Sequence, residues 1–235
     1  MTRTHGMLIA NPETALAVAC VLTLTGGFLD AFTYLDHGRV FANVMSANVV
    51  LLGVFAVSED WPQALKHVPP LIAFMLGVVA AQLIRLPGVR LRKPALVALS
   101  FEIAILAALS FLPRSFPHLS IVSAIAFAVA LQHASFTRVI HWSYNSVMTT
   151  VNLRIFTEGL FAALRPSRTP EIVRQAYTYG AICLSFLIGG IVGAFATRAF
   201  HNTALWVPVV LLASVLLRIA YPHKAAVGGD IQAPS

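Results

Sequence analysis

Long apolar runs separated by short polar segments dominate the chain. A helix that crosses a bilayer needs about 20 predominantly apolar residues, and several runs reach that length. They are Thr14–Leu35, Lys66–Leu86, Pro94–Leu112, Leu119–Thr137, Val173–Thr197 and Thr203–Tyr221. The pattern predicts an all-α integral membrane protein in which these six runs are the spanning helices.

Two further apolar stretches are weaker. Val44–Val57 is short for a crossing, and Ser146–Leu164 contains three strongly polar residues. Basic residues concentrate on the cytoplasmic side of membrane proteins. The clusters 85–93 and 165–174 share that side only if both weak stretches enter and return. We therefore predict six spanning helices plus two short re-entrant or broken helices, with both termini cytoplasmic. Eight spanning helices are the alternative.

The composition agrees with a membrane protein. Hydrophobic residues make up 58% of the chain and charged residues 11%, whereas soluble domains carry about 25% charged residues. The net charge is +7. The basic residues lie between apolar runs, where they set the topology. They form no patch interleaved with aromatic residues, so nothing in the sequence indicates nucleic-acid binding. We expect one transmembrane domain over 14–221, with tails at 1–13 and 222–235, the latter disordered.

A polar cluster interrupts the apolar sequence after the first run. Asp30 lies near the end of that run, and Asn43, Ser46 and Asn48 follow before the short stretch 49–57. A carboxylate within lipid is costly and usually lines a cavity or pathway. Ser46 and Asn48 can cap the backbone N–H groups of a half-helix or leave those groups facing a substrate. The alternatives are an interfacial capping acid and interhelical hydrogen bonds.

The second half of the chain repeats this pattern. Asp30 precedes Asn48 by 18 residues, and His133 precedes Asn152 by 19. Each pair is followed by a helix with small residues four apart, Gly77 and Ala81 in one half and Gly189 and Gly193 in the other. The halves, about 14–112 and 119–221, then form an inverted repeat, in which transport sites lie between broken helices. The small residues suit internal packing or a dimer equally well.

Other polar residues inside apolar sequence are candidates for the same pathway. Arg154 and Glu158 are four apart and predict an internal ion pair, with gating or substrate contact as the alternative. Asp36 and His37 are expected to be solvated in a loop, and His118 and His201 to be interfacial. The remaining pathway candidates are Glu102, Gln132, His133, Thr150 and Asn152.

The combination of Gly27-x-x-Asp30-Ala31, Asn43-x-x-Ser46-Ala47-Asn48 and Gln132-His133-Ala134 resembles the YoaK-like family of bacterial membrane proteins, a domain of unknown function. The resemblance covers roughly residues 17–217. Members typically carry Thr-Gly-Asn, Gln-Asn-Ala and Thr-Gly-Thr where this chain has 46–48, 132–134 and 150–152. The resemblance implies a multi-pass protein of the bacterial inner membrane and supplies no activity.

Catalytic and metal-binding motifs are absent from the sequence. We therefore expect no enzyme activity, no cofactor and no metal. The polar residues favour a transporter or channel for an unidentified small solute. The first alternative is a structural or regulatory membrane protein that binds a partner, with a homo-oligomer also open. The second is an enzyme acting on a lipid through Asp30 or His133.

Overall fold

The computed structural model describes residues 12–86, 94–136, 138–139, 142–143, 149–166 and 169–221. Both expected tails, apart from residues 12 and 13, and the basic residues Arg90, Arg92 and Lys93 lie outside them. The elements in chain order are α1 (Pro12–Asp36), α2 (Met45–Val57), α3 (Trp61–Leu65), α4 (Val68–Ile84), α5 (Pro94–Ser110), α6 (His118–Ser135), β1 (Arg138–Val139), β2 (Trp142–Ser143), α7 (Thr149–Ala163), α8 (Pro170–Phe200), η1 (His201–Leu205) and α9 (Trp206–Ala220). Every apolar run of the sequence is a helix, as predicted, and β1 and β2 form a minimal antiparallel pair.

Among the elements that the structure describes, the most extensive contact joins α1 to α8, from opposite halves of the chain. A Cβ added at Gly189 would lie 2.0 Å from the Leu24 carbonyl oxygen, and one at Gly193 would lie 2.6 Å from that of Phe28. Gly193 follows Gly189 by four residues and Phe28 follows Leu24 by four, so α1 and α8 run parallel. Only glycine allows backbones to approach this closely. The small residues of α8 therefore serve internal packing.

A second pair, α4 with α6, repeats this arrangement. A Cβ added at Gly77 would lie 2.4 Å from the Phe127 carbonyl oxygen, and Ala81 packs with Leu131. At the ends of both helices, the Arg85 guanidinium donates to the Ala134 carbonyl. These contacts also advance together, so α4 and α6 run parallel.

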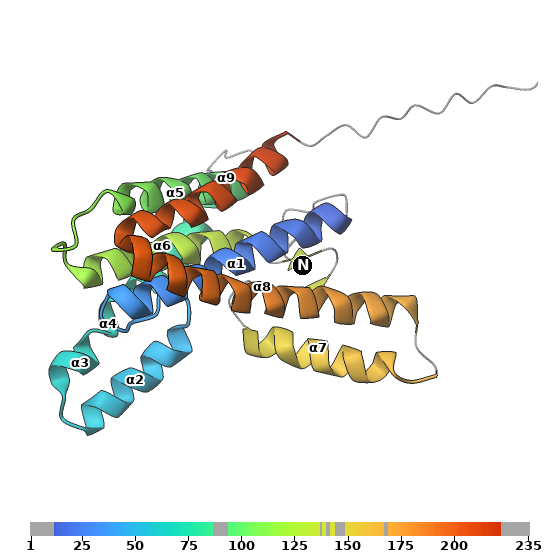
Figure 1. Cartoon of the computed structure of the whole chain (residues 1–235), viewed down its shortest axis with the longest axis horizontal. Coiled ribbons are helices and arrows are strands. Elements are labelled where there is room, and N and C mark those ends of the chain that lie inside the picture. Colours follow the sequence, from blue (N-terminus) through green and yellow to red (C-terminus); the bar gives the residue numbers. More distant parts are fainter. Residues whose placement is uncertain are drawn as a thin grey trace, which may run out of the picture.

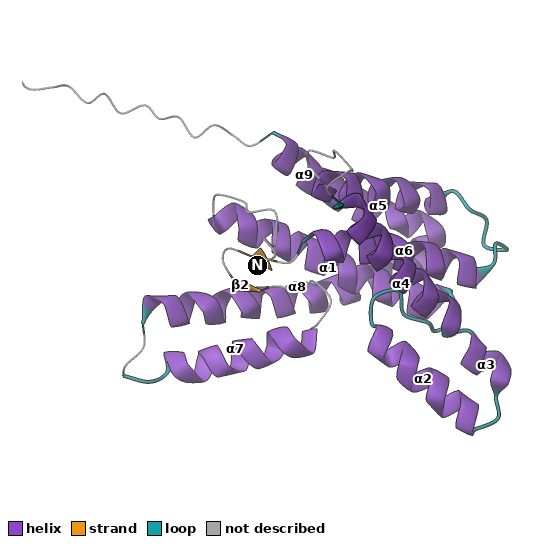
Figure 2. Ribbon diagram, turned by 180° about the vertical axis from the view of Figure 1, so that it is seen from behind, coloured by secondary structure: helices purple, strands orange, loops and turns teal. Residues whose placement is uncertain are grey.

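The remaining helices complete a bundle with two projections (Figure 1). α5 packs against α6 and α9, and the main apolar core lies among these helices and α1. α7 lies along α8, whereas α2 and α3 form a hairpin that extends away from the bundle (Figures 1 and 2).

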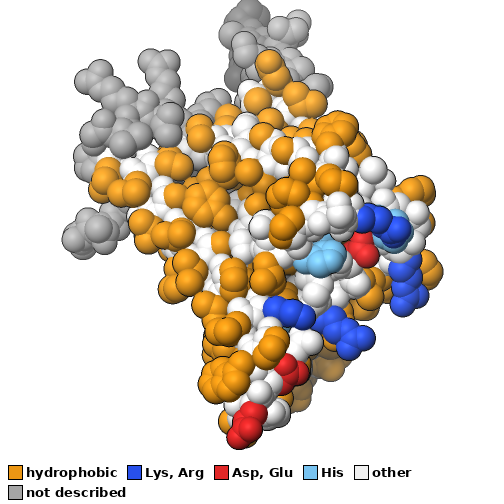
Figure 3. All heavy atoms as spheres, turned by 90° about the vertical axis from the view of Figure 1, so that its left-hand side faces the viewer, with side chains coloured by type: hydrophobic (Ala, Val, Ile, Leu, Met, Phe, Trp, Pro, Cys, Tyr) orange, Lys and Arg blue, Asp and Glu red, His pale blue; other side chains and the backbone are white. Residues whose placement is uncertain are grey.

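One end of the bundle gathers the ends of several helices. The Asp36 carboxylate lies 3.1 Å from His201 Nδ1, and His37 Nδ1 lies 3.1 Å from His118 Nδ1. At the same end the Asn202 amide donates to the Leu112 carbonyl at 2.9 Å. We call these five side chains the junction, and this end the junction end. Figure 3 faces this side of the molecule and shows charged and histidine side chains beside hydrophobic ones.

Four stretches of the described chain are long and apolar enough to cross a membrane, judged by length and composition. They are Ala15–Asp36, Trp61–Ile84, His118–Ser135 and Pro170–Ala220. The last contains both α8 and α9, and the apolar helices α2 and α5 are shorter. Large hydrophobic side chains such as Val57, Met75 and Phe195 are exposed on several helices, as lipid contact requires. The chain is a helical membrane protein.

Candidate functional site

The candidate site begins where the chain turns back beside α1. Residues 37–44, which we call the inward segment, leave the end of α1 and run back along it. The Asn43 backbone N–H donates to Asp30 Oδ1 at 2.9 Å, and the Asn43 amide donates to the Gly26 carbonyl at 3.1 Å. Gly26 lies ten residues before Asp36, which is about 15 Å along a helix. Non-helical backbone therefore reaches deep into the bundle before α2 begins.

Two oxygens at this break have no hydrogen-bond partner within the part of the chain that the structure describes. They are Asp30 Oδ2 and Asn43 Oδ1. Asp30 is 5% exposed and Asn43 is 4% exposed. Buried acceptors are rarely left unsatisfied in proteins. The pair can therefore accept hydrogen bonds from a ligand or a water, and the Asp30 carboxylate can also take up a proton.

Asn48 binds the inward segment instead of capping α2. Its Oδ1 accepts from the Phe41 N–H at 3.1 Å, and its Nδ2 donates to the Phe41 carbonyl at 2.7 Å. His67 Nδ1 lies 3.2 Å from the same Oδ1. The start of α2 has no side-chain cap. Of the roles left open for Asn48, the structure therefore shows hydrogen bonds to neighbouring segments and not a helix cap. Asn48 is fully buried. Its side-chain amide serves the N–H and the carbonyl of Phe41, which have no ladder or helix partner among the described residues in this non-helical segment.

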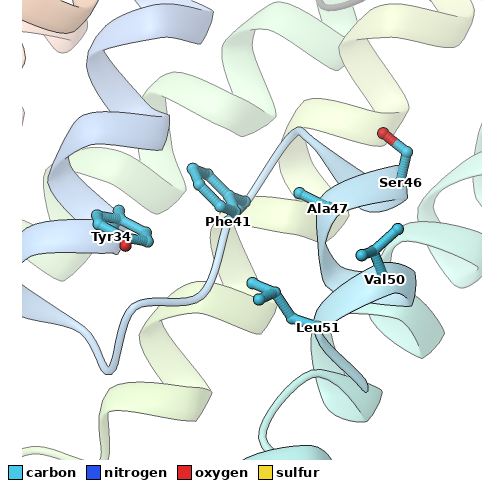
Figure 4. A pocket seen from close by; sticks show the side chains of 6 residues that line it. All are labelled: Tyr34, Phe41, Ser46, Ala47, Val50 and Leu51. Atoms are coloured by element: carbon cyan, nitrogen blue, oxygen red, sulfur yellow. The ribbon is translucent and has the colours of Figure 1, made fainter. Parts of the chain in front are cut away.

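A groove lies beside the break, between the end of α1, the inward segment and α2 (Figure 4). Its volume is about 480 Å³. Ser46 is the one predicted pathway residue in its lining, and the rest is mainly apolar. The lining residues are Tyr34, Phe41, Ser46, Ala47, Val50 and Leu51. The groove does not include Asp30, Asn43 or Asn48.

Three other predicted residues are buried separately from this break. Glu102 is 1% exposed on α5, and its Oε2 has no hydrogen-bond partner among the described residues. Gln132 is 2% exposed on α6, and its Nε2 likewise has no hydrogen-bond partner among the described residues. His133 is partly buried beside it. No hydrogen bond or ion pair described in the structure joins these residues to Asp30.

The second-half residues lie on two sides of α7. Asn152 is buried, whereas Thr150 is exposed. Arg154 Nε and Glu158 Oε1 are 3.9 Å apart, so the predicted pair forms. Their side chains are 70% and 67% exposed, so the prediction of an internal pair is wrong about its location. Spacing alone gives the shared face and not the direction in which that face points.

The junction was missed in the sequence. His37 is 2% exposed and contacts Phe32 as well as His118, so the expectation of a solvated loop histidine is wrong. No local signal could have found this cluster, because its members come from the end of α1, the start of α6 and the start of η1. In the described chain, no group of three or more histidine, cysteine or acidic side chains could hold a metal.

His37 gives an expected pH dependence. Burial lowers its pKa from 6.5 to about 4, His118 acts in the same direction, and Asp36 opposes both. As pH falls from 6.5 to about 4, the unfolded chain takes up a proton that the native state does not. Stability is therefore complete above this window and falls within it. In thermal unfolding in detergent, the melting temperature of His37→Gln should fall less steeply than that of the native protein as the pH drops from 6.5 to about 4. An equally steep fall would assign the loss of stability to other groups.

Comparisons with known proteins place the chain in a family. Residues 18–218 match the model of a protein of unknown function, DUF1275. The chain is 26% identical over 214 residues to the UPF0700 transmembrane protein YoaK of Bacillus subtilis (strain 168), an alignment that covers 88% of this chain and 94% of the relative. No solved structure matches. The chain therefore belongs to the DUF1275 family, as the motifs around Asp30, Asn48 and His133 indicated.

Proposed function

We propose that the protein is a carrier or channel for a small solute, without catalytic activity, whose polar site lies at the helix break beside Asp30. The observation that carries the proposal is the inward segment with its buried unsatisfied oxygens. Irregular backbone at membrane depth is tolerated only inside protein or along a water-filled cavity. Intramembrane acids mark pathways for substrates or ions. Asp30 Oδ2 and Asn43 Oδ1 fit a ligand that offers hydrogen-bond donors.

The direction of the helices supports six crossings with α2 and α7 as re-entrant helices. His37 and His118 are in contact, so the chain between them starts and ends on one side of the membrane. That requires an even number of crossings. α4 and α5 supply two, so α2 must return to the side from which the inward segment entered. Because α8 runs parallel to α1, it must start on the side where α1 starts, which is also the side where α6 ends. The chain between α6 and α8 therefore makes no net crossing, and α7 must return to the side from which it entered.

Reciprocal packing supports two inverted repeats. Gly189 packs on the carbonyl of Leu24, six residues before Asp30, and Gly77 packs on that of Phe127, six residues before His133. Each half thus inserts its glycine helix against the first helix of the other half. In carriers built this way the substrate lies near the midplane between the repeats.

The proposed location is the bacterial inner membrane, with both termini and the basic clusters in the cytoplasm and the junction end outside. Arg114 and Leu86 are both exposed and lie at opposite ends of the bundle. With both native cysteines replaced, Arg114→Cys should react in intact cells with a membrane-impermeant maleimide, and Leu86→Cys should not. Eight crossings would reverse this pattern.

The proposed site is tested by solute-dependent stability in detergent. A solute bound at about 100 times its dissociation constant adds about 2.7 kcal/mol to the free energy of unfolding. We expect one or more donor-rich solutes to raise the melting temperature of the native protein and of Asn202→Leu but not of Asn43→Leu. Asn202 is the matched control, since it is also a buried asparagine that donates one bond to a carbonyl and has an unpartnered Oδ1 among the described residues. A shift that survives in Asn43→Leu would refute the site.

A partner-binding protein without transport is the alternative. One observation favours it, namely that both polar atoms of Asn48 are already engaged by Phe41 and His67. These residues would then only hold the inward segment in place. Asn43→Leu and Asn202→Leu would both lower stability, and no solute in the panel would raise it.

A further inference from the structure

An ionic face lies on the outer side of α7. Thr150, Arg154, Thr157 and Glu158 are all exposed, and they lie on one side of the helix by their spacing. The opposite side packs on α8, which is the one helix that α7 contacts extensively in the described structure. We call these four residues the ionic face.

The ionic face lies at the depth of apolar sequence. Gly159 packs on Ala176, and Phe156 packs on Gly180, so α7 runs antiparallel to α8. Arg154 is then level with about residue 181 of α8. α8 carries no charged side chain between Arg174 and Arg198. At 1.5 Å per residue, Arg154 lies about 10 Å inside that uncharged stretch.

The other half of the protein supplies an internal comparison. Asn48 is the fourth residue of α2 and Asn152 the fourth of α7, and both are buried. In this register Arg154 corresponds to Val50 and Glu158 to Val54. Val50 is 63% exposed and Val54 is 52% exposed. The same outward positions are therefore apolar in α2, where Val50 also lines the groove, and charged in α7.

We propose that the ionic face of α7 is the contact between two copies of this chain. The inference rests on the re-entrant placement of α7 proposed above. Charged side chains at membrane depth face protein or water and not lipid. Each face carries one cation and one anion a helical turn apart. A two-fold axis along the membrane normal keeps both at their own depths, so each Arg154 lies one turn, about 6 Å, from the level of Glu158 of the second copy, an offset that the long arginine side chain can span. The surface is self-complementary in charge, as a symmetric dimer requires.

Cysteine cross-linking in native membranes tests this surface. Cys20 and Cys183 are first replaced by alanine. Thr157→Cys, between Arg154 and Glu158, should form a covalent dimer under mild oxidation because a two-fold contact brings such residues within disulfide range. Gly53→Cys is the matched control, since Gly53 holds the corresponding place on α2 and an added Cβ there meets nothing within 4 Å. It should give no dimer above background.

Charge reversal provides the second measurement. Arg154→Glu should reduce the cross-linked fraction of Thr157→Cys severalfold, and the double exchange Arg154→Glu with Glu158→Arg should restore it. If Thr157→Cys stays monomeric, the proposed contact is wrong. Reaction with a water-soluble maleimide, in membranes opened so that the reagent reaches both sides, would then assign the face to a water-filled pathway, and protection from it would assign the face to lipid. Solute-dependent stabilisation measured on the same monomeric variant would show that the carrier proposal stands without the dimer.

Discussion

Replacing Gly189 with alanine is expected to destabilise the protein by about 3 kcal/mol, the upper end of the usual cost of overpacking. The new methyl group would lie 2.0 Å from the Leu24 carbonyl oxygen and 2.8 Å from its carbon. Both atoms belong to the backbone of α1, so no side-chain rotation can make room. α1 and α8 would have to separate, and this contact joins the two halves of the chain. Thermal unfolding in detergent measures the effect.

The neighbouring glycine is the matched control. A Cβ added at Gly190 would meet only the Gly27 carbonyl oxygen, at 3.9 Å, which is an ordinary van der Waals distance. Gly190→Ala should therefore be neutral or stabilise the helix by up to about 1 kcal/mol. Equal losses in both variants would mean that α8 needs glycine for a reason other than its contact with α1.

Replacing Asn48 with leucine is the second large effect. The side chain is fully buried and satisfies both the N–H and the carbonyl of Phe41. Leucine leaves both groups without that partner, and each buried unsatisfied group costs about 1–3 kcal/mol. We expect the inward segment to detach from α2. The measurements are a lower unfolding temperature and faster proteolysis within residues 37–44.

Ser46→Ala is the control for this substitution. Ser46 is two residues away on the same helix, is exposed, and lines the groove beside Phe41. Its replacement should leave the unfolding temperature nearly unchanged. Similar losses in the two variants would place the stabilising contact elsewhere in α2. A loss confined to Asn48→Leu would show that Asn48 has a structural role, whether or not the neighbouring Asp30 binds a solute.

Local pattern was enough for the helices and for the position of the break. The apolar runs predicted the long helices to within a few residues, because a helix in a membrane satisfies its backbone internally whatever surrounds it. The short α3 was not predicted by any run. The short run 44–57 and the polar residues Asp30, Asn43 and Asn48 marked the break for the same reason. The repeated spacing also marked Asn48 and Asn152 as equivalent candidates, and both are buried in the structure.

The sequence by itself therefore determined which segments are helical and where polar groups interrupt them. Only the tertiary structure decided which surfaces meet, such as Gly189 on Leu24 and His37 on His118. Most of these helices are apolar on all sides, so no periodicity tells which face packs inward. For the same reason the spacing of Arg154 and Glu158 predicted a pair, whereas its place on the outer face depended on how α7 packs against α8.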